Sequence, residues 1–297
     1  MNWLDRIGPR RFGRWEVLIM RFLFAALVLF KTFPTEKQRL IDPDKPNGIA
    51  HFIDLTFIAN PDIYFPLQWI AIACLILYAS GVLLWLMLPY LAFFSIATCT
   101  LGNSDGGIGH SYQMVSLILL AQAVVVVVIA IKSRSFGWLS DGQTDTFLAY
   151  YAQIMIVLCY VTSGITKVKN SDGDWIWNSP YFAADIVKAE YQTHYSRLDE
   201  PLDEASIARG HWLVEHPMVA RLLFAPGLFF ELLAFFALLS RQWALLFGLA
   251  LIGMHSFIEF FMSLDFFLFQ ACVAIWLVNP AWWIYSGIRR INGLKAA

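Results

Sequence analysis

Long apolar runs separated by short polar segments dominate the hydrophobic pattern of this chain. A bilayer whose hydrocarbon core is about 30 Å thick requires about 20 apolar residues per helical crossing. Runs of that length lie at residues 15–33, 65–82, 84–102, 112–132, 146–166, 219–240, 242–262 and 264–287. The pattern predicts an all-α fold, a polytopic transmembrane bundle of about eight helices.

The second and third runs are separated only around Gly81, and Pro89 lies early in the third run. Glycine permits a tight turn, and proline removes a helical hydrogen bond. The pattern predicts a tight reversal between two helices, with one long re-entrant element as the alternative.

The longest polar segment, residues 167–218, contains many aromatic residues and is therefore unlike a disordered linker. They are Trp175, Trp177, Tyr181, Phe182, Tyr191, Tyr195 and Trp212. We expect an outer-side loop region that packs on the membrane surface or caps a cavity. The Ser-Pro start and helical spacing of residues 179–188 predict a short interfacial helix.

The distribution of charges between the apolar runs predicts the orientation. Basic residues resist translocation and therefore collect on the cytoplasmic side. The expected inner segments hold Arg6, Arg10, Arg11, Arg14, Lys132, Arg134, Arg241, Arg289, Arg290 and Lys295, whereas segments 34–64 and 167–218 are rich in Asp and Glu. Both termini are therefore expected in the cytoplasm. The first run lacks a small-residue cleavage site, so we expect a retained helix and a multi-pass protein of the plasma membrane, specifically a bacterial inner membrane.

Composition agrees with a membrane protein and excludes other classes. Of the 297 residues, 59% are hydrophobic and 14% charged, and the mean hydropathy is +0.59; soluble domains carry about 25% charged residues. We expect one membrane domain over residues 1–297. A net charge of −1 gives no basic surface for nucleic acid. Four cysteines lie inside the apolar runs without a CxxC pair, which argues against disulfides and zinc.

Ionisable residues inside apolar spans are costly and often mark a functional site. They are Arg21, His110, Lys167, Glu231, His255, Glu259 and Asp265. In the expected orientation, five of them come from the outer side. His255 and Glu259 share a helical face at i, i+4, but a second histidine is missing, so no metal site is predicted. For Lys167, one interpretation is a side chain that snorkels to the interface, and the other is a desolvated general base.

Several motifs together resemble one membrane family. Tyr-Val-Thr-Ser-Gly-Ile-Thr-Lys at residues 160–167, followed by Asp174-Trp175, resembles the Gly-x-x-Lys…Asp-Trp signature of the vitamin K-dependent γ-carboxylase-like family, also called HTTM proteins. His110-Ser111-Tyr112 is similar to the His-Ser-Tyr at the start of a central helix in that family. Gly253-Met254-His255 and Glu231 are similar to further family positions.

The resemblance implies a catalytic lysine that deprotonates a reduced quinone of the vitamin K or menaquinone type. Lys167 would be this base, and His110 and His255 would be polar catalytic groups in the same cavity. Tyr112, Glu231 and Trp175 would bind the cofactor. The carboxylase also has a large extramembrane C-terminal portion that holds its peptide substrate, whereas this chain ends soon after Arg289-Arg290. Peptide carboxylation is therefore not expected from the resemblance.

Two functions follow as hypotheses. The first is quinol-linked chemistry of the carboxylase and epoxidase type, with Lys167 as base. The second is a non-enzymatic membrane accessory protein for maturation or export of a peptide or partner protein. The expected partners are the lipid bilayer and an exported peptide or protein. A transporter is a weaker third hypothesis, because no pair of broken helices recurs in two halves.

Overall fold

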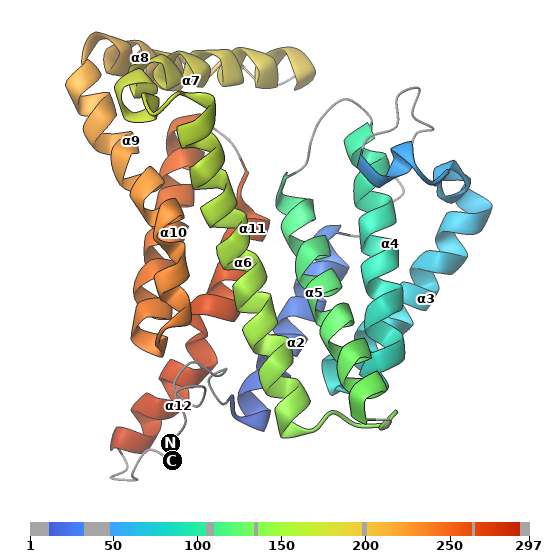
Figure 1. Cartoon of the computed structure of the whole chain (residues 1–297). Helices are drawn as coiled ribbons and strands as arrows, with labels where there is room; N and C mark the ends of the chain where they lie inside the picture. The colour runs from blue at the N-terminus through green and yellow to red at the C-terminus, as the bar shows by residue number, and fades with distance from the viewer. Residues whose placement is uncertain are drawn as a thin grey trace. The chain divides into compact units, whose positions relative to one another are not determined.

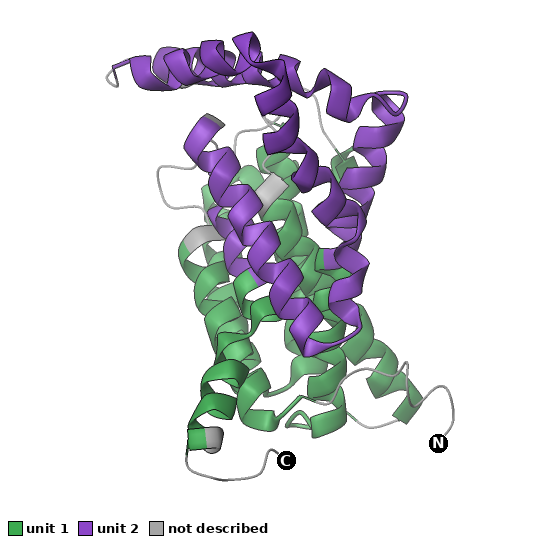
Figure 2. Cartoon of the chain, turned by 90° about the vertical axis from the view of Figure 1, so that its left-hand side faces the viewer, with its two compact units in different colours: residues 1–156, 274–297 green, residues 157–273 purple. Residues whose placement is uncertain are grey.

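The structure, a computed structural model, describes residues 12–32, 48–104, 110–133, 136–197, 201–262 and 265–291. Every regular element among these residues is a helix, apart from an isolated bridge between Val82 and Leu139 (Figure 1). The chain forms two compact units (Figure 2): unit 1 comprises residues 1–156 and 274–297, and unit 2 comprises residues 157–273. Helix α6 runs through both units, so this division does not test the prediction of a single domain.

Six helices within the described ranges are long and apolar enough to cross a membrane. They cover Pro61–Ser80, Leu84–Ser104, Tyr112–Ser133, Gly142–Asn170, Arg241–Phe261 and Phe267–Ile288. A seventh span is counted if Glu204–Glu215 and Pro217–Leu232, which are bent by 102°, are taken together. The expected polytopic helical fold agrees with these spans, while the sidedness of the termini stays a prediction.

Three of the eight predicted runs are not regular α-helices over their whole length. The run at 15–33 forms α2 (Arg14–Leu27), which passes into a π-helical turn at Val28–Thr32. The run at 219–240 forms α9 (Pro217–Leu232), followed by a 3-10 turn at Ala234–Leu238. The run at 264–287 forms α11 (Phe267–Val273), a π-helical turn at Ala274–Val278 and α12 (Pro280–Ile291). Hydropathy alone does not detect these breaks, because the residues on both sides are apolar.

Unit 1 contains the first half of the chain and its C-terminal helix. Its helices are α2, α3 (Pro61–Ser80), α4 (Leu84–Ser104), α5 (His110–Ser133), the first half of α6 (Gly142–Asn170) and α12 (Pro280–Ile291), with short turns at Gly48–His51, Thr56–Ala59 and Ala274–Val278. Phe24 packs edge-on against Trp276, with 5.5 Å between ring centroids. The Tyr78 hydroxyl donates to Gln122 Oε1 at 2.9 Å. The contact between these rings and the buried Tyr78–Gln122 hydrogen bond thus help to hold this unit together.

The turn between α3 and α4 is the predicted tight reversal. Gly81 ends α3 in the left-handed conformation with φ 80°. A Cβ atom there would lie 2.8 Å from both Arg21 Nη2 and Ser140 Oγ. Arg21 Nη1 donates to Ser140 Oγ at 3.1 Å and to Asp145 Oδ1 at 2.7 Å. Only glycine fits here, because of both its φ and the space that the buried arginine occupies.

Helix α6 begins with a side-chain cap. The Asp141 carboxylate accepts a hydrogen bond from the Thr144 backbone N–H at 2.6 Å, and this bond lowers the pKa of Asp141. Such a cap satisfies an N–H group that has no partner within the helix. The 29-residue helix therefore has a defined start.

Unit 2 contains the second half of α6, α7 (Trp175–Arg197), α8 (Glu204–Glu215), α9, α10 (Arg241–Met262) and α11 (Phe267–Val273). Helices α7 and α8 lie side by side, across the ends of α6 and α9 (Figure 1). The expected loop at 167–218 is therefore mostly a pair of helices. Ala183, Ile186 and Leu213 form its core with Ala220 and Phe224 of α9.

The short helix predicted at 179–188 belongs to the longer α7. Pro180 lies inside α7 and has no N–H to donate to the carbonyl of Ile176. The Ser179 hydroxyl donates to that carbonyl instead, at 2.7 Å. This substitute bond explains why Ser-Pro does not mark the start of the helix.

Candidate functional site

One face of α6 in unit 2 carries a row of polar side chains. Tyr160, Ser163 and Lys167 follow one another at i, i+3 and i+7, a spacing that puts them on the same side of a helix. Lys167 lies in the last turn of α6. The row therefore extends from the buried middle of the helix to its end.

Lys167 and Glu231 form an ion pair between α6 and α9. Lys167 Nζ lies 2.6 Å from both carboxylate oxygens of Glu231, and the Ser163 hydroxyl donates to Oε1 at 3.4 Å. The Glu231 side chain is 5% exposed and the Lys167 side chain 32%. The carboxylate is thus enclosed, while its cation keeps access to the surroundings.

Gly164 allows α6 and α9 to approach closely beside this pair. A Cβ at Gly164 would lie 2.9 Å from Leu232 Cδ2 and 3.1 Å from the Leu232 backbone nitrogen. Backbone cannot move aside as a flexible side chain can. The Gly-x-x-Lys motif thus has a structural explanation, because its glycine brings α9 and Glu231 within reach of Lys167.

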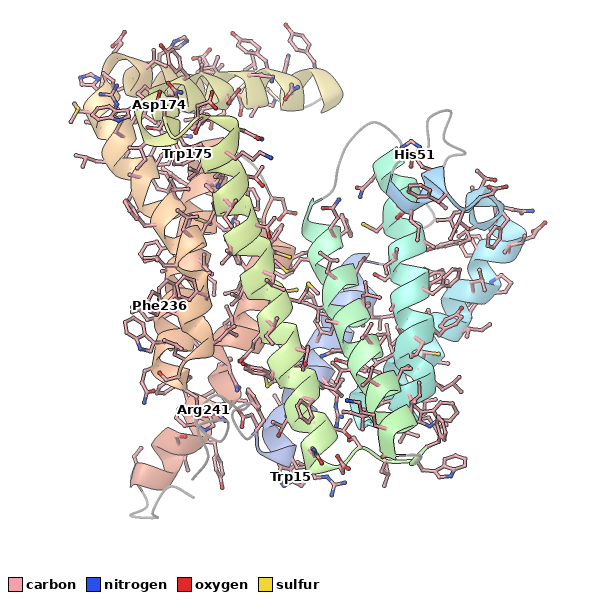
Figure 3. The ribbon with its side chains drawn as sticks, viewed as in Figure 1. Trp15, His51, Asp174, Trp175, Phe236 and Arg241 are labelled. Atoms are coloured by element: carbon pink, nitrogen blue, oxygen red, sulfur yellow. The ribbon has the colours of Figure 1, made fainter. Side chains whose placement is uncertain are left out.

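The turn between α6 and α7 brings Trp175 back to Lys167. Gly173 has φ 90°, and its N–H donates to the Val168 carbonyl at 2.9 Å. Asp174 and Trp175 lie where α7 begins (Figure 3). Lys167 Nζ lies 5.3 Å from the centroid of the Trp175 ring, a cation–π distance. Trp175 and Glu231 therefore contact the same ammonium group.

A pocket of about 440 Å³ opens beside this cluster. Its polar lining groups among the described residues include Lys167 and Asp185, and most of the others are apolar. The lining comprises Lys167, Trp175, Phe182, Asp185, Leu223, Phe224, Pro226, Gly227, Phe230, Ala250, Gly253, Met254, Phe257 and Ile258. Sites for small organic ligands combine such an apolar wall with a few polar groups.

His255 lies in a separate buried cluster of unit 2. Its Nε2 lies 2.8 Å from the Tyr160 hydroxyl, and its ring stacks on Phe266 and Phe269, with centroids at 4.6 and 5.3 Å. His255 is 5% exposed, and its Nδ1 has no hydrogen-bond partner within the described parts of the chain. Gly253, Met254 and Phe257 line the pocket, but His255 is not among the described lining residues.

The predicted site residues fall into two groups. Lys167, Glu231 and Trp175 contact one another, and His255 lies in the same unit. Tyr112 belongs to α5 of unit 1, where its carbonyl accepts a hydrogen bond from Ser116. The backbone of α5 begins at His110, but the side chain of His110 lies outside the described residues. The roles proposed for all these residues stay predictions.

Sequence reasoning did not include Ser163, Asp185 and the pairing of Tyr160 with His255. The i, i+3, i+7 spacing of Tyr160, Ser163 and Lys167 could have indicated that Ser163 lies on the same helical face as Lys167, because this spacing repeats with the helical period. The Tyr160–His255 contact joins residues 95 apart, which no local pattern encodes. Among the described residues, no group of three or more His, Cys, Asp or Glu side chains is arranged to hold a metal ion.

Comparison of the chain with protein-family models, with curated proteins and with solved structures finds no match. The apolar helices nevertheless define a class, a multi-pass α-helical membrane protein. Within that class, the Lys167–Glu231 pair and its adjoining pocket are the candidate site.

Proposed function

We propose that this protein is a membrane enzyme that binds a reduced isoprenoid quinone and uses Lys167 as the base toward it. The observation that carries the proposal is the position of Lys167. Its amine lies at the wall of an apolar pocket, in contact with the nearly buried Glu231 carboxylate and the face of Trp175. The resemblance to HTTM proteins supports the same assignment from the sequence.

The pocket residues fit such a ligand. A volume of about 440 Å³ lies within the range of roughly 300–1,000 Å³ for organic ligands. Phe182, Phe230 and Phe257 offer apolar contact to a ring system and an isoprenoid chain, and Lys167 offers a polar contact to a ring hydroxyl. A bound reduced quinone would supply those hydroxyls and the electrons for reaction with oxygen.

Glu231 and Trp175 prepare Lys167 for proton exchange. An ammonium group cannot accept a proton, so Lys167 must first release one. The Glu231 oxygens at 2.6 Å are the nearest acceptors, and a transfer from Nζ to the carboxylate leaves both groups neutral. The amine can then take a proton from a ligand, and Trp175 stabilises the cation that re-forms.

The tight ion pair also supports the second hypothesis, a non-enzymatic accessory protein. A pair that occupies both carboxylate oxygens joins α6 to α9 whether or not a ligand binds. In that case Lys167 and Glu231 would be structural residues, and the pocket would hold bulk lipid.

Ligand analysis followed by turnover separates the two functions. The protein is purified in mild detergent, its bound quinones are quantified by mass spectrometry, and oxidation of added menaquinol is followed with oxygen present. Variants are Lys167→Met, the matched control Lys169→Met, and Gly253→Leu. Lys169 is an exposed lysine two residues further along the chain, and a Cβ at Gly253 meets no atom within 4 Å, so leucine should fill the pocket.

For an enzyme we expect stoichiometric quinone in wild type and Lys169→Met, and loss of quinone in Gly253→Leu. Lys167→Met should keep the quinone but lose at least 100-fold in oxidation rate, the scale of a general base. Only phospholipid in every variant, or full activity of Lys167→Met, would refute the enzyme proposal.

A further inference from the structure

Helix α7 carries an exposed row of aromatic residues that do not line the pocket; of these, Trp177 contacts Arg221 of α9, whose guanidinium lies 4.9 Å from the ring centroid. Trp177, Tyr181, Tyr191 and Tyr195 are 62%, 75%, 40% and 68% exposed. Together with the exposed residues Ala184 and Lys188 they follow a 4-3-4-3-4 spacing, which keeps them on one side of a helix. We call these six residues the aromatic stripe.

The aromatic stripe and the buried residues of α7 lie on different sides of the helix. The opposite side of α7 is buried, with Ser179, Ala183 and Ile186 at most 1% exposed. At about 100° per residue, the pocket-lining positions Trp175 and Phe182 lie about 160° and 140° from the centre of the stripe, and Asp185 lies about 80° from it. The stripe therefore lies on the side of α7 opposite Ser179, Ala183 and Ile186. Figure 2 shows α7 and α8 extending to one side of the other helices of unit 2.

The order of residues in the stripe is symmetric. Trp177 and Tyr195 lie nine residues on either side of Ile186, Tyr181 and Tyr191 lie five on either side, and Ala184 and Lys188 lie two on either side. An antiparallel pair of such helices, related by a two-fold axis, would place an aromatic ring opposite an aromatic ring at both ends. An isologous interface requires this kind of self-complementary surface.

We infer that the aromatic stripe is the contact surface for a second copy of this chain, with the two α7 helices antiparallel about Ile186. In this pairing Lys188 lies opposite the small Ala184 of the second copy, which leaves room for the lysine stem. Its ammonium group lies beside the second copy's Asp185, as in the charged flanks of a coiled coil.

The stripe is large enough to contribute much of a dimer interface. Its length from Trp177 to Tyr195 is about 27 Å at 1.5 Å per residue. The exposed fractions of the four rings, applied to roughly 200 Å² per ring, give on the order of 500 Å² per copy. A stable interface buries about 800 Å² per partner, so the stripe provides more than half of it.

Cysteine cross-linking in native membranes tests both the partner and the register. Two tagged copies of the full chain are co-expressed, one with Ala184→Cys and the other with Lys188→Cys, and oxidised with copper phenanthroline. A matched control pairs Ala184→Cys with Trp177→Cys, which lies on the same stripe but about 16 Å out of the proposed register at 1.5 Å per residue. Tyr181→Cys with Tyr191→Cys gives a second in-register pair.

We expect disulfide-linked heterodimers of the two in-register pairs, at least five-fold more than of the control pair. Tyr181→Lys with Tyr191→Lys, two exposed changes, should convert the purified dimer to a monomer in light scattering while its helical circular dichroism is unchanged. Equal cross-linking of the control pair, cross-links only to other polypeptides, or a monomeric wild type in lipid nanodiscs would each overturn the inference.

Discussion

Replacing Lys167 with methionine should destabilise the protein in a strongly pH-dependent way. The change leaves the Glu231 carboxylate, whose residue is 4% exposed, without its cation. Breaking a buried pair by removing one partner costs about 3–5 kcal/mol. The variant can limit this cost by binding a proton at the carboxyl group.

The free energy of protonation sets the upper limit of the loss. Protonating an ordinary carboxyl group of pKa about 4.3 costs about 3.7 kcal/mol at pH 7 and about 1.6 kcal/mol at pH 5.5. The unfolded chain releases its proton above pH 4.3, whereas the folded variant retains it. The loss of stability therefore grows as the pH rises and nearly disappears as the pH falls toward 4.3.

Glu231→Gln should be milder, because it leaves a Lys167 side chain that is 32% exposed and can reach water. We expect about 1 kcal/mol, with little change between pH 5.5 and 8. The double variant Lys167→Met/Glu231→Gln should recover most of the loss of Lys167→Met, because no buried charge remains.

The assay is unfolding of the purified protein by sodium dodecyl sulfate in mixed micelles, followed by circular dichroism at pH 5.5, 7 and 8. Lys169→Met serves as the surface control and should leave the midpoint unchanged. Equal losses for Lys167→Met and Glu231→Gln, or a loss for Lys167→Met that does not vary with pH, would refute this account of the pair.

Three further changes test other parts of the structure. Gly164→Ala should lower the free energy of unfolding by about 1–3 kcal/mol, because the added methyl group forces α9 away from α6. Gly102→Ala is the control and should cost nothing, because a Cβ there meets no atom within 4 Å. Thermal melting compares the two variants, and equal melting temperatures would contradict the close approach of α6 and α9. Arg21→Met should lower the free energy of unfolding by about 3–5 kcal/mol, because it leaves the enclosed Asp145 carboxylate unpaired. The double variant Arg21→Met/Asp145→Leu should lose less stability in the same thermal melts. A double variant less stable than Arg21→Met would refute the explanation by an unpaired charge. Asp141→Ala should cost about 0.5–1 kcal/mol near neutral pH by removing the cap of α6. The cap lowers the pKa of Asp141. The stability that the cap contributes is therefore present above pH about 3.9 and is lost as the pH falls through the lower pKa of the folded protein. A difference in unfolding free energy between wild type and Asp141→Ala that stays constant down to pH 2 would argue against this role of the cap.

Much of the fold could be predicted from hydropathy, and the contacts of the site could not. The spans α3, α4, α5, α6 and α10 follow directly from runs of apolar residues, and Gly81 marked the reversal between two of them. The sequence predicts a loop region at 167–218 because this is the longest polar segment between two apolar runs. This segment forms helices because its buried positions at 179, 183, 186 and 190 repeat with the helical period.

The ion pair at the site joins residues 64 positions apart. From the sequence, Lys167 and Glu231 were separate ionisable residues in apolar surroundings, and only the resemblance placed them in one site. Their contact depends on the α6–α7 turn, on the bend of 102° between α8 and α9, and on the space left by Gly164. Hydropathy predicts none of these features, because they depend on the path of the backbone and on the distance between two helices.

The pairing of Lys167 with Glu231 also constrains the biogenesis of the protein. Lys167 emerges from the ribosome first, and Glu231 follows only after α7 and α8 have been synthesised. A carboxylate inside an apolar helix inserts poorly into a bilayer by itself. Helix α9 should therefore enter the membrane against α6 that is already in place, so that the late helix is accepted because an earlier one carries its counter-charge.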